Sequence, residues 1–255
     1  MSIPPFDESG IAIVPLSEKG RELIGQIKEI IETVFGRPID PCVLDLSGDD
    51  YFRLVLDAQN QINELELIAR IFEHDGTVLR RAIGGLKPAA QRIAHFRAVR
   101  PQKSGRNESV GFHRESFFNA DMSRAWNVWI AVRDVFPENC VKYVPKSQLI
   151  PESEIVTRNE GAQAGLVARN SEGHRVGLLY DPLTIVSGVN FADLETMYVP
   201  EDHMAVFDSN LIHGGGANLT DLIRFSIDFR FIAMEHVYNF EYNLAADGPY
   251  FASLG

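Results

Sequence analysis

Two histidines and one acid are the residues of this chain whose types and spacing could do chemistry. His113 and Glu115 are separated by a single residue, and His213 follows 98 residues beyond Glu115. In an extended segment, side chains two residues apart lie on one face, so His113 and Glu115 can bind one metal ion while Arg114 points away. Two imidazoles and one carboxylate suit non-haem Fe(II) oxygenases and leave three positions on the iron open. We therefore predict an iron site formed by His113, Glu115 and His213.

The His-x-Glu pair is weak evidence when it is taken alone. Seven histidines and 35 acids among 255 residues give about one such pair by chance, and the chain contains one. The third ligand, far along the chain, carries the prediction. The other histidines are expected to be structural, with His95 and His174 the best candidates to meet a substrate. The remaining three are His74, His203 and His236.

The segment Arg224–Ile232 alternates more clearly than any other part of the chain. Its apolar face consists of Phe225, Ile227, Phe229 and Phe231, and its polar face of Arg224, Ser226, Asp228 and Arg230. We expect the apolar face to pack under the N-terminal helices and the polar face to line a barrel interior. Two arginines and one aspartate are costly there unless an anion or a tight network satisfies them, and a bound dicarboxylate would do so.

Length and composition describe an ordinary globular chain. With 255 residues, of which 45% are hydrophobic, one domain over 1–255 is expected. The net charge of −11 opposes binding to nucleic acid or anionic lipid, and no apolar run reaches the roughly 18 residues of a membrane span. Cys42 and Cys140 are expected to be reduced, and no signal segment follows Met1. We therefore expect a cytoplasmic protein that acts on a small molecule.

Positive charge is concentrated just before the His113 segment. Between Asp75 and Glu108 there is no acid, but the stretch holds eight of the 24 lysines and arginines. They are Arg80, Arg81, Lys87, Arg92, Arg97, Arg100, Lys103 and Arg106. Two interpretations are open: solvated surface charge that pairs with acids elsewhere, or a cationic approach for an anionic substrate.

Helices are expected early in the chain and strands later. Residues 10–16 alternate into a strand, and Ser17 is a reasonable N-cap for an amphipathic helix that ends near Gly36. A second helical zone is expected over about 49–81. Residues 151–203 contain five glycines and no steady period, which is typical of a lid-like insert. Strands are expected at Ile93–Arg100, Trp126–Val132, Val141–Val144, Gly177–Leu179, Met204–Phe207 and Arg224–Ile232.

Further motifs follow the predicted metal ligands in a specific order. They are Trp126–Val135 with Pro137-Glu138-Asn139, then Val144-Pro145-Lys146-Ser147-Gln148, and the spacing from His213 to Arg224 with Gly214, Gly215, Gly216 and Asn218 between them. On these motifs, which span most of the chain, the sequence resembles the phytanoyl-CoA dioxygenase-like branch of the Fe(II)/2-oxoglutarate-dependent oxygenases. The resemblance implies a mainly β fold with N-terminal helices. Its barrel would be a double-stranded β-helix, or cupin-like jelly roll, over about residues 91–240, buttressed by α-helices from about residues 1–90.

The resemblance also implies the cofactors and the residues that bind them. The cofactors are Fe(II), 2-oxoglutarate as co-substrate and dioxygen, and the usual reaction hydroxylates an aliphatic carbon with release of succinate and CO2. Arg224 would bind the far carboxylate of 2-oxoglutarate as a bidentate fork, Ser226 would add a hydroxyl donor, and Asn127 would donate to a carboxylate. Arg230 is the alternative anchor, although an ion pair with Asp228 describes it better.

Two places depart from the family pattern. Glu115 stands where this branch usually has aspartate, and a carboxylate one methylene longer can still bind Fe(II). Lys146 and Gln148 stand where many members have glycine and histidine, and they are expected to be surface differences. Two other functions stay open: a cupin-like metal-dependent isomerase and a non-catalytic ligand-binding relative. The oligomeric state is open between monomer and homodimer.

Overall fold

The computed structural model describes residues 9–102, 108, 110–117, 120–158, 183–239 and 251–254. Its α-helices are α1 (Glu18–Phe35), α2 (Gly48–Glu64) and α3 (Leu67–Ala82). Its strands are β1 (Ile11–Pro15), β2 (Pro88–Gln91), β3 (His95–Val99), β4 (Trp126–Arg133), β5 (Val141–Tyr143), β6 (Val156–Arg158), β7 (Thr184–Ser187), β8 (Glu195–Thr196), β9 (His203–Asp208), β10 (His213–Gly215), β11 (Arg224–Ala233) and β12 (Phe251–Ser253). The short helices that matter for the site are η2 (Glu115–Phe117) and η4 (Ser147–Leu149).

The N-terminal helices begin and end where capping chemistry allows. Ser17 caps α1, because its hydroxyl accepts a hydrogen bond at 3.0 Å from a backbone N–H of the first turn. The helix ends at Gly36, whose φ of 98° suits glycine. The helical zone expected over 49–81 is confirmed, and Leu65 and Glu66 divide it into the two helices α2 and α3. Glu66 has a left-handed φ of 52°, which redirects the chain between two helices that each bury an apolar face.

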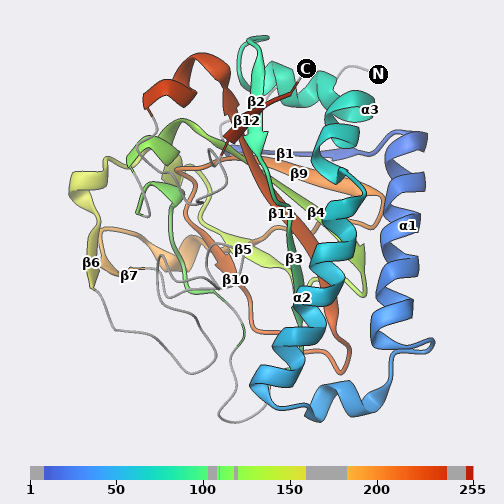
Figure 1. Ribbon diagram of the computed structural model, residues 1–255. Coiled ribbons are helices and arrows are strands. Elements are labelled where there is room, and N and C mark those ends of the chain that lie inside the picture. Colours follow the sequence, from blue (N-terminus) through green and yellow to red (C-terminus); the bar gives the residue numbers. More distant parts are fainter. Residues whose placement is uncertain are drawn as a thin grey trace.

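The strands form the two antiparallel layers of a double-stranded β-helix (Figure 1). The large sheet has the order β1-β9-β4-β11-β2-β12, and β3 pairs with β11 beside β2. The small sheet has the order β10-β5-β8, and β6 and β7 form a separate pair. In Figure 1 the helices α1 to α3 lie on one side of the large sheet, and β5 and β10 lie on the other. The mainly β fold with helical support is therefore confirmed.

Most expected strands are present, and the exceptions are short or lie outside the described residues. β1, β3, β4, β5, β9 and β11 match expected strands. The strand expected at Gly177–Leu179 lies outside the described residues, as does much of the lid-like insert, because residues 159–182 are not described. Six strands were not expected, since two to four residues carry too short an alternation to be recognised: β2, β6, β7, β8, β10 and β12.

β11 has an apolar face and a polar face, as its alternation predicts. Its four apolar side chains belong to the same core cluster as the buried faces of α1, α2 and α3. Phe225 packs edge-on against Phe35 of α1 at 5.1 Å between ring centroids, and Phe231 packs against Phe72 of α3 at 5.4 Å. The polar face of the same strand is thus turned toward the small sheet, where the predicted site lies.

The outer edge of β3 is held by side chains of α2. The carboxamide of Asn63 bonds both backbone groups of Ala94, at 2.8 and 3.1 Å, and Gln59 accepts the backbone N–H of Phe96 at 3.1 Å. These bonds replace the strand neighbour that β3 lacks on that side. Among the described helices, none combines the length and apolar character that a membrane crossing requires. Both cysteines are free, as expected.

Candidate metal and co-substrate site

Two segments about a hundred residues apart meet at the predicted metal ligands. His113 and His213 form an isolated antiparallel bridge, with reciprocal backbone hydrogen bonds of 2.9 and 3.1 Å. The extended segment expected through Glu115 is wrong, because Glu115 opens the short helix η2 instead. Its backbone N–H is fixed by the carbonyl of Ser209 at 3.0 Å. The strand-like part therefore ends at His113, and the turn that follows brings the carboxylate back toward both imidazoles.

The three side chains lie together with their ligand atoms facing one another. His113, Glu115 and His213 are all buried, and one ligand atom of each lies within 4.8 Å of the others. Oε1 of Glu115 is 4.0 Å from Nε2 of His113 and 3.8 Å from Nε2 of His213. These three atoms are the ones that would hold a metal ion, since imidazole nitrogen and carboxylate oxygen are ligands of first-row metals.

Backbone carbonyls orient both imidazole rings. Nδ1 of His113 lies 2.7 Å from the carbonyl of Gly111, and Nδ1 of His213 lies 2.8 Å from that of Leu211. A carbonyl only accepts, so in each ring Nδ1 carries the proton and Nε2 keeps its lone pair. Metal-binding histidines characteristically have their other nitrogen bonded in this way. The two rings thus present the correct atom to a metal.

The charge states of the trio are those that metal binding requires. Burial lowers the pKa of His113 to about 3 and also lowers the pKa of His213, so both imidazoles are neutral near pH 7. Burial raises the pKa of Glu115, but the Arg230 guanidinium beside it outweighs burial, and the net pKa lies below its usual range. Two neutral imidazoles and one carboxylate are the protonation states in which these ligands bind metal.

Arg114 points away from the trio, as predicted, and ties it to the turn at Ser147. Its guanidinium donates to the carbonyl of Ser147 and, at 2.8 Å, to the carbonyl of Ile150. The hydroxyl of Ser147 accepts the backbone N–H of Ile212, the residue before His213, at 2.7 Å. Ser147 is therefore bonded to the chain neighbours of all three proposed ligands. In the same turn Lys146 is exposed as expected, whereas Gln148 is half-buried.

Arg224 and Ser226 lie buried on the polar face of β11 with bonding capacity left over. One guanidinium nitrogen of Arg224 donates to the carbonyl of Asn139 at 2.8 Å. Nε of Arg224 and the hydroxyl of Ser226 have no hydrogen-bond partner among the described residues. Burial lowers the pKa of Arg224 to about 10, which leaves it cationic at neutral pH. A buried cation beside a buried hydroxyl, both with donors to spare, fits a carboxylate ligand.

Asn127 lies on β4 directly across from Arg230, so both side chains project to the same face of the sheet. Asn127 is buried, and its amide nitrogen is 3.5 Å from the hydroxyl of Ser209, whose carbonyl binds the backbone of Glu115. Asn127 is therefore not a solvent-facing residue of the sheet. Asn127 lies at the metal end of the interior rather than near Arg224.

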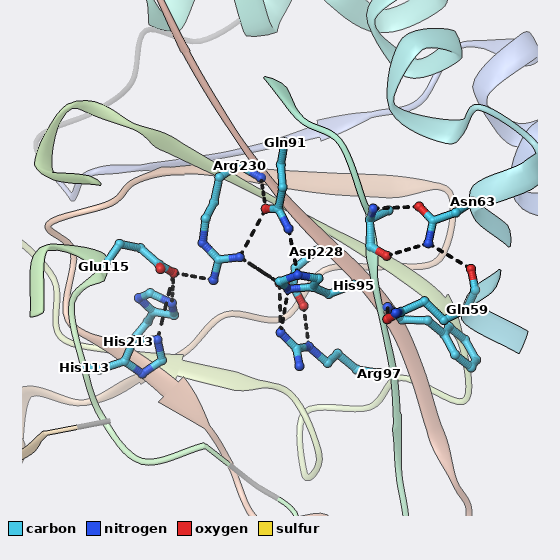
Figure 2. Close-up of polar contacts among 12 residues, drawn as sticks. Gln59, Asn63, Gln91, His95, Arg97, His113, Glu115, His213, Asp228 and Arg230 are labelled. Carbon is cyan, nitrogen blue, oxygen red and sulfur yellow. Dashed lines mark hydrogen bonds and ion pairs between the residues drawn. The ribbon is translucent and has the colours of Figure 1, made fainter. Parts of the chain in front are cut away.

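Arg230 and Asp228 belong to a network that reaches the trio (Figure 2). Arg230 donates to Oε1 of Glu115 at 2.7 Å, and its other terminal nitrogen lies 3.5 Å from Asp228. Asp228 in turn receives both Nε and a terminal nitrogen of Arg97, at 2.7 and 3.2 Å. The ion pair expected between Arg230 and Asp228 is thus present at 3.5 Å, and Asp228 binds Arg97 more closely. Gln91 completes the network, and the sequence does not indicate it because β2 is too short to predict.

Two arginines of the cationic stretch before His113 are paired with acids in the part of the chain that is described. Arg97 pairs with Asp228, and Arg100 pairs with Glu108 at 2.6 Å and stacks on the ring of Tyr51. Lys103 and Arg106 lie outside the described residues. His174 also lies outside them, whereas His95 contacts Asp228 at 3.4 Å.

Solved structures share this fold at low sequence identity. The non-heme monooxygenase ThoJ in its apo form is 14% identical, with a TM-score of 0.53, over 89% of this chain and 75% of that one. EvdO2 from Micromonospora carbonacea var. aurantiaca is 16% identical, over 89% of this chain and 88% of that one, with TM-scores of 0.53 alone and 0.54 complexed with 2-oxoglutarate. At this identity the likeness concerns the fold. No curated protein matches the chain.

Residues 57–226, two thirds of the chain, match the family model described as phytanoyl-CoA dioxygenase (PhyH). The matched region contains the metal trio, Asn127, Arg224 and Ser226. Enzymes of this family use Fe(II), 2-oxoglutarate and dioxygen, and the donor set of the buried trio fits the metal. The chain therefore belongs to the phytanoyl-CoA dioxygenase family of Fe(II)- and 2-oxoglutarate-dependent non-haem enzymes.

Proposed function

We propose that this enzyme is a 2-oxoglutarate-dependent dioxygenase that hydroxylates an aliphatic carbon of a small molecule and releases succinate and CO2. One observation carries the proposal: the buried atoms Nε2 of His113, Nε2 of His213 and Oε1 of Glu115 face one another, with both rings held in the metal-binding tautomer. Within the proposal, residues 1–255 work as one catalytic unit.

In this proposal the interior residues bind 2-oxoglutarate at both of its ends: one group of residues lies at the metal, and another binds the far carboxylate. His113, Glu115 and His213 hold Fe(II), which supplies the activation of dioxygen that the side chains cannot provide. Arg224 and Ser226 bind the far carboxylate of 2-oxoglutarate through the donors that they have to spare. Asn127, which lies at the metal end, would donate to the near carboxylate of 2-oxoglutarate. EvdO2, which has the same fold, was crystallised with 2-oxoglutarate.

An apolar cluster flanks both ligand-bearing segments. Phe112 and Ile212, the neighbours of the two proposed histidine ligands, belong to this cluster together with Phe117 and Phe191. The rings of Phe112 and Phe191 lie 5.2 Å apart between centroids. These apolar contacts stabilise the two segments that carry the proposed histidine ligands.

The proposal is tested by an anaerobic titration of apo-protein with Fe(II) and then 2-oxoglutarate, followed by the visible charge-transfer band of the iron chelate. We expect the band in wild type and in His203→Ala, a histidine outside the site, and no band in His213→Ala. Absence of the band in folded wild type would contradict the proposal and favour the metal-dependent isomerase or the non-catalytic ligand-binding protein.

We further propose an anionic group on the substrate, on the basis of the cationic stretch before His113. The apparent affinity for such a substrate should fall as ionic strength rises, because salt screens the attraction between separated charges. Steady-state kinetics between low and physiological salt measure this, with 2-oxoglutarate saturating. If the apparent affinity does not change with ionic strength, the arginines of this stretch do not attract the substrate.

A further inference from the structure

The polar face of β11 carries two arginines that the sequence left as rivals for one role. Arg224 and Arg230 are six residues apart, which places their Cα atoms roughly 20 Å apart along a strand. Arg224 bonds the carbonyl of Asn139, whereas Arg230 bonds Glu115 at 2.7 Å. The two guanidinium groups therefore serve different ends of the interior.

The contact between Arg230 and Glu115 involves the oxygen that faces the histidines. Oε1 of Glu115 receives the guanidinium N–H at 2.7 Å and is also the atom nearest Nε2 of His113 and of His213. A carboxylate oxygen has two lone-pair directions, so one can accept from Arg230 while the other points to a metal. The charge-assisted bond holds this oxygen in place before a metal arrives.

Arg230 is itself held by groups from two other strands, as Figure 2 shows. The side-chain oxygen of Gln91 on β2 accepts the backbone N–H of Arg230 at 3.2 Å and its guanidinium at 3.4 Å. The same guanidinium lies 3.5 Å from Asp228 and 3.5 Å from the ring of His95 on β3. Arg97 fixes Asp228 with two bonds. The guanidinium thus has little freedom to move away from Glu115.

We propose that Arg230 is a positioning residue for the metal ligand Glu115: it holds Oε1 toward the two imidazoles, so that the glutamate binds the metal through one oxygen. This inference rests on the proposed function, since it assigns a role within the same metal site. It also assigns the two arginines separately, Arg230 to the metal ligand and Arg224 to the co-substrate.

The test is a pair of matched substitutions on one strand face, Arg230→Met and Arg224→Met. Co(II), which does not oxidise readily as Fe(II) does, is titrated alone into apo-protein and followed by its visible ligand-field absorption. Loss of an outer residue that orients a ligand typically costs 10–100-fold in metal affinity. We expect that loss in Arg230→Met, with a changed Co(II) spectrum, and an unchanged Co(II) affinity in Arg224→Met.

A second titration with 2-oxoglutarate, at saturating Co(II), completes the separation. We expect Arg224→Met to lose 2-oxoglutarate binding and Arg230→Met to retain it within a few-fold. The opposite result, in which Arg230→Met binds Co(II) normally and loses 2-oxoglutarate, would make Arg230 the co-substrate anchor and overturn the inference. Normal binding of both ligands by Arg230→Met would overturn it as well.

Arg230→Lys covers the case in which the methionine variant does not fold. Lysine keeps the charge but has no fork to join Glu115, Gln91 and Asp228, so we expect a smaller loss of Co(II) affinity than in the methionine variant and a native circular dichroism spectrum. Unchanged Co(II) affinity in a folded lysine variant would count against positioning by the fork. If wild type itself binds no Co(II), the proposed metal site fails, and the inference fails with it.

Discussion

The side-chain length of Glu115 determines how the metal trio is arranged. The backbone N–H of Glu115 is bonded to the carbonyl of Ser209, and its Oε1 must reach both Arg230 at 2.7 Å and the imidazoles at 3.8 and 4.0 Å. An aspartate on the same backbone is one methylene shorter, so its carboxylate can approach Arg230 or the metal but not both. The glutamate and Arg230 therefore form a matched pair.

Glu115→Asp is expected to weaken metal binding by about tenfold or more, although aspartate is the residue that this family usually has there. The physical reason is the lost reach between Arg230 and the histidines. Co(II) titration of the apo-protein measures the effect, and Glu115→Gln, which removes the charge, should lose more affinity than the aspartate variant. If Glu115→Asp binds Co(II) as tightly as wild type, metal binding does not depend on a glutamate long enough to reach both Arg230 and the histidines.

Among the structural elements, the turn that begins η4 connects the segments that carry the ligands. The backbone carbonyl of Ser147 accepts from Arg114, and its hydroxyl accepts the N–H of Ile212 at 2.7 Å. Arg114 lies between His113 and Glu115, and Ile212 precedes His213. A single buried serine thus sets the distance between the two halves of the trio.

Ser147→Ala should lower the free energy of unfolding by about 1–3 kcal/mol, because the buried N–H of Ile212 loses its acceptor. Metal affinity should fall in the same variant, since the segment before His213 is freed. Urea denaturation and Co(II) titration measure the two effects. The matched control is Ser187→Ala at an exposed serine of β7, which should change stability by less than about 0.5 kcal/mol. Equal stability of the two variants would show that the hydroxyl of Ser147 is dispensable.

The local pattern of the sequence predicted the elements whose period repeats several times. β11 has four polar residues that alternate with four apolar ones, so both its buried face and its two arginines could be placed. The partners of Arg230 could not, because Gln91 and His95 come from strands whose register with β11 is set by packing, not by their own sequence. Glu115 was placed in a strand for a related reason, since two residues of alternation do not distinguish a strand from the first turn of η2.

In the whole molecule, the helical layer on one side of the large sheet leaves the opposite face to carry buried polar groups. His95 is one of these, and burial lowers its pKa to about 4. Its ordinary pKa in the unfolded chain is 6.5, so the unfolded state binds more protons than the folded state between these values. Stability contributed by neutral His95 is therefore complete above pH 6.5 and is lost as the pH falls toward 4.

The free energy of unfolding of the apo-protein should thus fall between pH 6.5 and pH 4, with about 3 kcal/mol due to His95 at roughly 1.36 kcal/mol per pKa unit. His113 and His213 act in the same direction. The contribution of His95 is the difference between wild type and His95→Gln in the pH dependence of the free energy of unfolding. The free energy of the variant should change less between pH 6.5 and pH 4. Chemical denaturation at several pH values measures both profiles, and parallel profiles would contradict the assignment.

The backbone bridge between His113 and His213 should keep the metal site folded when the ion is absent. Its two hydrogen bonds need no ion, and the helical core forms on the far side of the sheet. Unlike a zinc finger, which unfolds without its metal, this chain should keep its circular dichroism spectrum and cooperative unfolding after treatment with a chelator. Loss of iron should then be reversible. A molecule that has lost its ion stays folded and can bind iron again when iron is supplied, without new protein synthesis.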